Sequence, residues 1–465
     1  MKNKSKLVSA FFITAILFPP STYADEVCAV SGQSVSCSAP FINNNAETVL
    51  SQALIDTLNR NFTANVYDFS AANAAPVPSS FTPALSPGAS KRRGLAKLLL
   101  SEADPSDPLS GFRTADFRGL PSYAFAYLDE LTTKAMDSAT TSIDLAMFSV
   151  TLKEMPDAIA RAKSRGVKVR MITDESHVYP KMFPALKAII DTGIEVRSLR
   201  GTRSYGVMHN KICIYDNRFV TTGSYNWTFG ATFQNYENMI FSWNSSCLEG
   251  YRKYWDWMWS NSRTLSQGPS PELPEGAYGA PPADPSPSMD FNGTKLPSYS
   301  FSPGGKTEDM LVKTLDTAKE SVDAVTFTLY SQKLADAVIR AKERGIKVRF
   351  MMDKAMGKKT AFAKYLVDKG VEFRWSTGRK GKGSMHNKYA IFDGKLLETG
   401  SFNWTQNAEL NSFENVMLTD APKTIAAYQS KYNFLYDQAE TPAPGDLVVT
   451  PDDSSKSEPS EEFEE

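Results

Sequence analysis

Histidine is scarce in this chain, with only three among 465 residues. Long apolar stretches are absent too, since the best membrane candidate covers only residues 7–18. A helix needs about 20 apolar residues to cross a bilayer, so we expect a soluble mature protein without a transmembrane segment. The hydrophobic content of 42% is that of a globular protein, which excludes a largely disordered or membrane-embedded chain.

The short apolar run at the start is typical of an export signal. Lys2, Lys4 and Lys6 precede it, and "PPSTYADE" follows it with small residues that suit signal peptidase. We expect cleavage after Ala24 and therefore an exported protein, either periplasmic or secreted. An uncleaved membrane anchor is the alternative interpretation.

Cysteine is also rare, with four residues. Cys28 and Cys37 lie close together after the expected cleavage site, and an exported chain favours disulfides, so we predict a local bridge between them. Cys213 and Cys247 have no counterparts in the second half of the chain. They either pair with each other or remain buried thiols, and the sequence leaves both alternatives open.

The net charge of −1 conceals a gradient along the chain. Residues 151–400 carry 37 lysines and arginines against 26 acidic residues, whereas the last fifteen residues carry seven acids and one lysine. The tail is typical of a solvated, disordered end. The basic middle fits an anionic substrate, although surplus lysine also serves ordinary solubility.

The chain contains an internal duplication. Four blocks occur twice in the same order, 176 to 179 residues apart: "LPSYAF" and "LPSYSF", "TSIDLAMFSVT" and "ESVDAVTFTLY", "AIARAKSRGVKVRMITDE" and "AVIRAKERGIKVRFMMDK", and "MHNKICIYDNRFVTTGSYNWT" and "MHNKYAIFDGKLLETGSFNWT". Ordered and near-constant spacing predicts two copies of one domain. Two of the three histidines, His209 and His386, stand in the last block.

Stretches rich in proline, with glycine or with alanine and serine, separate the copies from each other and from the N-terminal segment, in which we expect a helix near 46–61. The predicted organisation is a signal peptide (1–24), an N-terminal segment with a linker (25–111), a first repeat domain (112–265), a linker (266–290), a second repeat domain (291–438) and an acidic disordered tail (439–465).

Each copy has the pattern of an α/β domain with a largely parallel or mixed sheet. A helix (126–138; 308–320) precedes a β-rich run (142–150; 321–330), a second helix that ends at a glycine, and a further strand (167–172; 346–351). The last block is predicted to form a hairpin, because Asp393-Gly394 is a strong tight-turn signal and Asp216-Asn217 a weaker one. Alternation then places each histidine and the lysine two residues later on one strand face.

Both copies satisfy H-x-K-x-x-x-x-D-x-x-x-x-x-x-G-S-x-N, followed by Trp-Thr and by a glutamate eleven residues after the asparagine. This pattern resembles the phospholipase D superfamily, whose HKD motif it matches at every defining position, over roughly 112–437. The resemblance implies an α/β fold of two homologous domains, each a mixed sheet flanked by helices, packed about a pseudo-twofold axis within a monomer. The implied site comprises the catalytic residues His209, Lys211, Asp216, His386, Lys388 and Asp393 and the phosphate-binding or supporting residues Ser224, Asn226, Glu237, Ser401, Asn403 and Glu414.

The pairing of histidines suits phosphodiester cleavage. One imidazole attacks phosphorus, and a second protonates the leaving oxygen and then activates water. The lysines hold phosphate oxygens, so neither a metal nor another cofactor is required. By family analogy His209 is the nucleophile and His386 the acid. Each ring needs an orienting carboxylate, either Asp216 and Asp393 or Glu237 and Glu414.

The third histidine, His177, has no partner in the repeat and is expected to be a surface or packing residue. Basic loops approach both motif histidines, and they either contact substrate or are solvated. Their charged residues are Arg200, Arg203, Arg379, Lys380 and Lys382.

The substrate class is less defined than the reaction class. Phospholipid hydrolysis, with transient contact to a membrane surface, is favoured because the chain has an export signal and is not strongly basic. A nonspecific endonuclease for DNA or RNA is the main alternative. A cardiolipin synthase-like phosphatidyltransferase and a noncatalytic phosphate-binding module rank lower.

Overall fold

The computed structural model describes residues 27–31, 34–38, 120–282 and 286–447, and it divides into an N-terminal unit that ends at residue 102 and a unit from 103 onward. In the N-terminal unit, β1 (Val27–Ser31) and β2 (Ser34–Ser38) form a hairpin in which Cys28 lies opposite Cys37. That register is compatible with the predicted local disulfide, which stays a prediction. The signal peptide, the helix near 46–61 and the tail beyond residue 447 lie outside the described residues.

The first lobe is built on an eight-stranded sheet in the order β10-β6-β5-β4-β7-β8-β9-β3. The neighbours β4, β5 and β6 are parallel, and the other pairings are antiparallel. The strands are β3 (Tyr123–Ala124), β4 (Ser142–Met147), β5 (Lys168–Asp174), β6 (Glu195–Leu199), β7 (Lys211–Tyr215), β8 (Phe219–Gly223), β9 (Met239–Ser242) and β10 (Arg263–Thr264). The helices are α4 (Leu128–Ser138), α5 (Glu154–Ser164), α6 (Pro184–Asp191), α7 (Phe229–Phe233) and α8 (Ser245–Asn261).

The second lobe repeats this plan on a seven-stranded sheet in the order β13-β21-β19-β18-β14-β16-β17. Its strands are β13 (Tyr299–Ser302), β14 (Ser321–Thr326), β16 (Lys347–Asp353), β17 (Glu372–Ser376), β18 (Tyr389–Phe392), β19 (Leu396–Gly400) and β21 (Glu414–Thr419), with the short strands β11 (Ser288–Phe291), β12 (Thr294–Pro297), β15 (Leu329–Tyr330) and β20 (Trp404–Thr405) outside the sheet. The helices are α9 (Thr307–Thr317), α10 (Gln332–Glu343), α11 (Lys354–Gly357), α12 (Ala361–Asp368), α13 (Gln406–Leu410) and α14 (Pro422–Gln438). The predicted α/β class, with two homologous domains on mixed sheets, is confirmed.

Turn chemistry explains why the elements end where they do. After α5 and α10 the chain reaches Gly166 (φ 85°) and Gly345 (φ 82°), which adopt the left-handed backbone that ends a helix. The β7–β8 turn has φ of 52° at both Asp216 and Asn217, and its counterpart has 55° at Asp393 and 59° at the following glycine. Positive φ at both central residues defines the tight hairpin turn that the sequence predicted.

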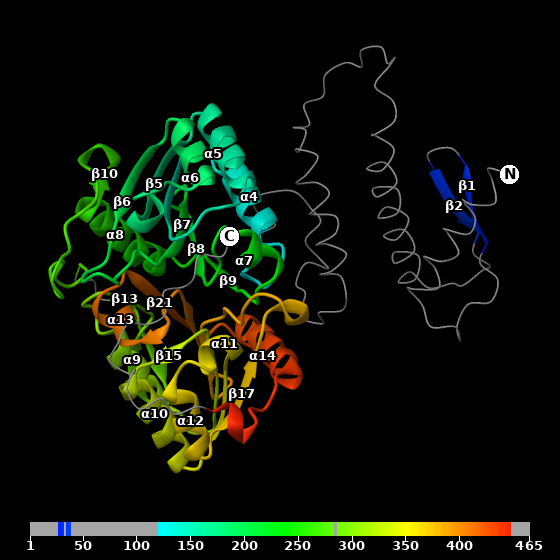
Figure 1. The fold of residues 1–465 in the computed structure, drawn as a ribbon, viewed down its shortest axis with the longest axis vertical. Coiled ribbons are helices and arrows are strands. Elements are labelled where there is room, and N and C mark those ends of the chain that lie inside the picture. Colours follow the sequence, from blue (N-terminus) through cyan, green and yellow to red (C-terminus); the bar gives the residue numbers. More distant parts are fainter. Residues whose placement is uncertain (1–26, 32–33, 39–119, 283–285, 448–465) are drawn as a thin grey trace. The chain divides into compact units, whose positions relative to one another are not determined.

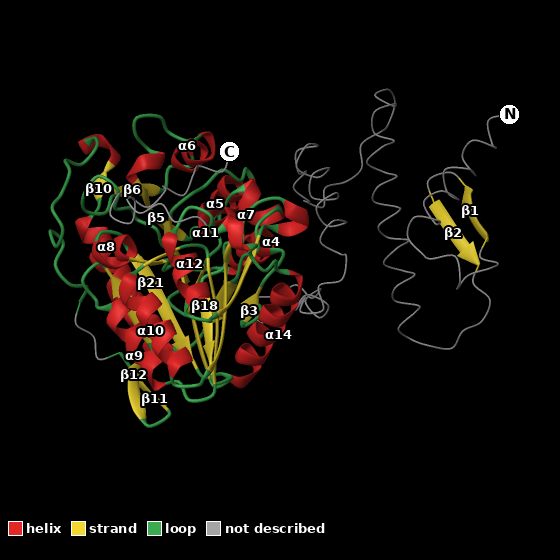
Figure 2. Cartoon of the chain, turned by 60° about the horizontal axis from the view of Figure 1, so that its bottom comes forward, coloured by secondary structure: helices red, strands yellow, loops and turns green. Residues whose placement is uncertain are grey.

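The two lobes share part of their cores. In each lobe, one face of the sheet is covered by helices of that lobe. The other face packs against the long helix α8 or α14 and against residues of the opposite lobe. One shared cluster joins Met208 and Trp255 of the first lobe to Phe413 of the second. The other joins Met385 and Tyr428 of the second lobe to Phe125 of the first. Figures 1 and 2 show the resulting arrangement, with the sheets inside and the helices outside.

The segment predicted as the interdomain linker packs on the first lobe. The backbone N–H and hydroxyl of Ser270 donate to the Glu175 carboxylate at 2.9 and 2.7 Å. The N–H of Arg203 donates to the carbonyl of Leu273 at 2.6 Å. Further along, the ring of Tyr278 lies 4.8 Å from that of Phe413 in the second lobe. The linker therefore runs from a first-lobe loop to the contact between the lobes.

Cys213 and Cys247 of the first lobe are buried free thiols, which decides between the two alternatives that the sequence left open. Burial raises the pKa of both thiols to about 12. Among the described residues, no helix is both long and apolar enough to cross a membrane.

Candidate active site

The two motif histidines are fixed by the opposite lobe. His209 lies just before β7, and its backbone N–H donates to the carbonyl of Phe413 at 3.0 Å. His386 lies just before β18, and its N–H donates to the carbonyl of Tyr236 at 3.1 Å. Each histidine therefore stands at the interface between the lobes.

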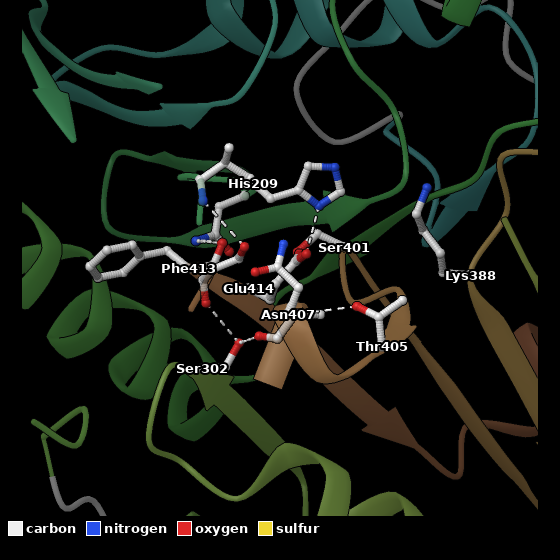
Figure 3. A network of polar contacts seen from close by, with 12 residues as sticks. His209, Ser302, Lys388, Ser401, Thr405, Asn407, Phe413 and Glu414 are labelled. Carbon is white, nitrogen blue, oxygen red and sulfur yellow. Dashed lines mark hydrogen bonds and ion pairs between the residues drawn. The ribbon is translucent and has the colours of Figure 1, made fainter. Parts of the chain in front are cut away.

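The orienting carboxylates also come from the opposite lobe. Nδ1 of His209 lies 2.7 Å from Oε1 of Glu414, and Nδ1 of His386 lies 2.8 Å from Oε1 of Glu237. Both glutamates are about 98% buried or more. Figure 3 shows the His209 ring above Glu414. A carboxylate on Nδ1 selects the tautomer in which Nε2 is available for chemistry, so glutamates, and not aspartates, orient these rings.

The two motif lysines are buried beside the histidines. Nζ of Lys211 donates to the carbonyl of His209 at 2.7 Å, and Nζ of Lys388 donates to that of His386 at 3.0 Å. Each ammonium lies about 5 Å above a phenylalanine ring that also meets the neighbouring imidazole edge-on. The two lysines place positive charge beside both imidazoles, which makes this centre suited to an anion.

The motif serines support the glutamate strands. Ser224 donates to Glu237 and accepts the backbone N–H of Asn238 at 3.0 Å. Ser401 accepts the backbone N–H of Asn415 at 3.1 Å. The motif asparagines Asn226 and Asn403 follow β8 and β19 and are more than 90% buried.

The structure corrects the prediction that Asp216 and Asp393 are catalytic, because both lie in the hairpin turns that follow β7 and β18. The Asp216 carboxylate accepts N–H groups of residues 140–142 at 2.8 to 3.0 Å, and Asp393 accepts those of 319–321 at 2.7 to 3.1 Å. Burial alone would raise the pKa of each carboxyl, but these hydrogen bonds lower it below the ordinary value. The seven residues from His209 to Asp216 amount to roughly 20 Å of extended chain. The aspartates therefore tie the hairpin turn to the start of β4 or β14.

Sequence reasoning missed four asparagines that join the two halves of the site. Nδ2 of Asn238 donates to Oδ1 of Asn387 at 2.9 Å, and Nδ2 of Asn415 donates to Oδ1 of Asn210 at 2.8 Å. All four are completely buried. A signal was present, because the middle residue of "HNK" and the residue after the glutamate are asparagine in both copies.

Two strand-end aspartates were also missed. Asp174 accepts the N–H of Met208 at 2.7 Å, and Asp353 accepts that of Met385 at 2.9 Å, so each holds the residue before a histidine. Burial raises the pKa of Asp353, while backbone hydrogen bonds and nearby His386 oppose the rise. Their recurrence at the end of "VRMITD" and "VRFMMD" was the available signal.

His177 is a packing residue and is not exposed, which selects one of the two predicted alternatives. It is 98% buried, and its ring lies 4.7 Å from those of Phe148 and Phe183. Phe148 separates it from His209.

The basic residues in the loops before the histidines fall into two groups, those bonded to backbone carbonyls and those exposed to solvent. Two basic side chains bind backbone carbonyls: Arg200 bonds to Arg203 at 2.8 Å and Arg379 to Phe125 at 2.8 Å. Arg203 and Lys382 are exposed. Tyr205 in the first loop is 47% exposed.

Helix α13 adds an apolar residue beside that tyrosine. Leu410 is 39% exposed, and Asn407 of the same helix donates to the carbonyl of Tyr205 at 3.2 Å. The first-lobe loop and α13 thus form one edge with exposed aromatic and aliphatic groups. We call Tyr205 and Leu410 the apolar edge.

Both lobes match one known protein family. Residues 132–259 and 311–435, more than half of the chain, match the family model described as cardiolipin synthase, PLD-like domain. The chain belongs to the phospholipase D-like family. Both matched segments contain one histidine, one lysine and one glutamate of the site.

Relatives of this family resemble single parts of the chain. The mitochondrial cardiolipin hydrolase of Chlamydomonas reinhardtii is 34% identical over 127 residues, which is 26% of this chain and 54% of that protein. The phospholipase D of Rickettsia prowazekii is 32% identical over 123 residues, 26% of this chain and 57% of that protein. The chain thus spans about half the length of these curated relatives.

A solved structure resembles both lobes together. The phosphatidylserine synthase of Haemophilus influenzae has a TM-score of 0.54 and 14% identity, and the likeness covers 69% of this chain and 87% of that one. At this identity the likeness concerns the fold of the two-lobed phospholipase D-like unit.

Proposed function

We propose that the chain is a phosphodiesterase that hydrolyses phospholipids through a phosphohistidine intermediate. The observation that carries this proposal is the crossed pairing of His209 with Glu414 and of His386 with Glu237. Because each lobe supplies the carboxylate for the other lobe's histidine, neither lobe contains a complete half-site alone. A single centre built from both lobes fits one phosphate between two imidazoles.

Buried positive charge supports an anionic substrate. Lys211 and Lys388 each lie next to a motif imidazole, with their ammonium groups bonded to the carbonyls of His209 and His386. A phosphodiester anion bound between the imidazoles would place its nonbridging oxygens close to both ammonium groups.

The reaction then proceeds in two displacements. Nε2 of one histidine attacks phosphorus, the bond from phosphorus to the leaving oxygen breaks, and that oxygen takes the proton from Nε2 of the other histidine. The second histidine next removes a proton from water, whose oxygen attacks phosphorus and breaks the phosphorus–nitrogen bond. Following the family resemblance, we assign His209 as nucleophile and His386 as acid and base. Lys211 and Lys388 stabilise the nonbridging oxygens.

Lipid is preferred over nucleic acid on two grounds. The two curated relatives described above are named cardiolipin hydrolase and phospholipase D. The apolar edge of Tyr205 and Leu410 beside the loop that leads to His209 fits an interface with acyl chains. Together with the signal-like N-terminus, this supports an exported enzyme that contacts a membrane surface transiently.

A nonspecific nuclease is the second candidate. Exposed Arg203 lies two residues from exposed Tyr205, and a basic group beside an aromatic ring fits a phosphate followed by a stacked base.

One panel of substrates separates the two functions. Purified protein in excess EDTA is incubated with vesicles of phosphatidylcholine or cardiolipin and with single- and double-stranded DNA. We expect headgroup release from lipid and intact DNA. DNA fragments with intact lipid would establish the alternative, and activity that needs an added divalent metal would contradict the two-imidazole mechanism.

The apolar edge provides a matched control. Tyr205→Ser with Leu410→Ser is expected to lower the rate on vesicles about tenfold, because exposed apolar area drives interfacial binding. The rate on a monomeric short-chain phosphodiester should change less than about twofold. Equal losses on both substrates would contradict a role at the lipid surface.

A further inference from the structure

The two half-sites differ at the residue two positions before each glutamate. That residue is Asn235 in the first lobe and Ser412 in the second. Both side chains do the same task for the loop that precedes the opposite histidine: Oδ1 of Asn235 accepts the N–H of Ser384 at 2.8 Å, and Oγ of Ser412 accepts the N–H of Val207 at 3.2 Å.

Asn235 has a second polar arm that serine lacks. Its Nδ2 donates to Oε1 of Glu237 at 3.2 Å. Glu237 therefore receives the amide of Asn235, the hydroxyl of Ser224 and the ring of His386. Its carboxylate is held from three directions and is 1% exposed.

Glu414 is held differently. Oε1 contacts His209 at 2.7 Å, whereas Oε2 has no hydrogen-bond partner among the described residues although it is buried. Ser412 bonds to Val207, and Ser401 accepts from Asn415. The carboxylate of Glu414, which orients His209, therefore lacks the two hydrogen bonds that Asn235 and Ser224 donate to the oxygens of Glu237.

Asn235 also contacts the loop that precedes His386. Its carbonyl accepts Nε of Arg379 at 3.0 Å, and the preceding carbonyl, of Gln234, accepts the backbone N–H of Arg379 at 2.6 Å. A Cβ at Gly383 would lie 2.5 Å from Oδ1 of Asn235, so the loop packs closely on this amide. The position of Glu237 is therefore linked to the loop before His386.

We propose that Asn235 is a positioning residue that fixes Glu237, and through it His386, and that the two histidines differ in mobility for this reason. The inference rests on the proposed function. A histidine that serves first as acid and then as base acts twice from one position, which favours a fixed ring. A nucleophile must follow phosphorus from a contact of about 3 Å to a covalent bond, which favours a carboxylate that can adjust.

Two substitutions at Asn235 test this. Asn235→Asp keeps the acceptor for Ser384 but replaces the donor with a charge that repels Glu237. Asn235→Ser places serine two residues before Glu237, as Ser412 stands two residues before Glu414. We expect kcat to fall about 10- to 100-fold in the aspartate variant and about fivefold in the serine variant, with KM within about threefold, because positioning affects the chemical step.

Ring-nitrogen spectra provide a readout that a general loss of structure would not produce. With ¹⁵N-labelled histidine, three residues give an assignable spectrum. Asn235→Asp should move the signals of His386 and leave those of His209 in place. Ser412→Ala is the matched variant in the other half-site: it removes the acceptor for Val207 and should leave the His386 signals in place.

The converse variant sharpens the test. Ser412→Asn adds an amide beside the unpartnered Oε2 of Glu414, so it should move the His209 signals and slow formation of the phosphoenzyme. Wild-type kcat in Asn235→Asp, or equal movement of both histidines' signals, would overturn the inference. If the wild-type protein cleaves neither lipid nor nucleic acid, the proposed function fails, while the spectra still decide the positioning role because they need no turnover.

Discussion

The two lobes are closest to identical where they face each other and diverge where they face their own cores or solvent. Histidine, glutamate and the two buried asparagines of each half-site recur without change and make contacts across the interface. The lysine also recurs, bonded in each lobe to the carbonyl of the histidine two residues before it. Positions behind them differ. Cys213 and Thr221 of the first lobe correspond to Ala390 and Glu398 of the second. Shared chemistry therefore constrains the residues at the interface, whereas the residues behind them differ between the lobes.

The largest effect should come from removing either histidine. His209→Ala and His386→Ala are each expected to lower kcat by at least about 10⁴-fold, and the double variant should be no worse, because groups that act as one unit are not additive. Steady-state rates on the preferred substrate check this. Two independent centres would instead leave about half the activity in each single variant.

The crossed glutamates should rank next. Glu414→Gln and Glu237→Gln are expected to lower kcat roughly 10³-fold, since the amide does not stabilise an imidazolium or select the tautomer. Glu175→Gln, a buried glutamate that binds the linker, is the control and should stay within about twofold. Comparable losses in the control would show that the effect is structural.

The hairpin aspartates should affect stability and not turnover. Asp216→Asn and Asp393→Asn are each expected to cost about 1–3 kcal/mol of unfolding free energy, because charge-assisted bonds to backbone N–H groups are weakened. The lowered pKa of each carboxyl means that its contribution is present above the unfolded pKa of about 4 and is lost as pH falls through the folded value. Urea titrations from pH 3 to 7 measure it. A kcat that fell with stability unchanged would restore the aspartates to the catalytic group.

The smallest effect concerns the differing cores. Burial raises the pKa of fully buried Glu398 well above its ordinary value. Its contribution to stability is therefore complete below the unfolded pKa of about 4.3 and is lost as pH rises toward the folded value. Glu398→Gln should remove this loss, with a gain on the order of 1 kcal/mol at pH 9. Melting curves at pH 5 and 9 test it, and an unchanged pH dependence would contradict a buried neutral acid.

The sequence predicted those features of the fold that depend on local rules. Gly166 and Gly345 marked the helix ends, and the turns at residues 216 and 393 marked the hairpins, because left-handed backbone restricts residue choice. Two repeats of one motif predicted two homologous lobes. These inferences needed no knowledge of how distant segments pack.

The side-chain contacts of the site were not predictable in the same way. Glu237 lies 28 residues from His209 in the chain but orients His386, because the lobes exchange carboxylates across their interface. Asp216 has the spacing of a motif residue, yet its contacts are backbone N–H groups and threonine hydroxyls at the start of β4. Spacing along one chain does not distinguish a contact within a lobe from a contact between lobes, so the carboxylate assignment required coordinates.

The central claim is that both imidazoles act on one phosphorus atom. Orthovanadate mimics the five-coordinate transition state of phosphoryl transfer, so a crystal structure of the complex tests it most directly. We predict a single vanadium atom between Nε2 of His209 and Nε2 of His386, with each Nδ1 bonded to the glutamate of the opposite lobe. Vanadate bound to only one histidine, or two vanadates in separate pockets, would contradict the account.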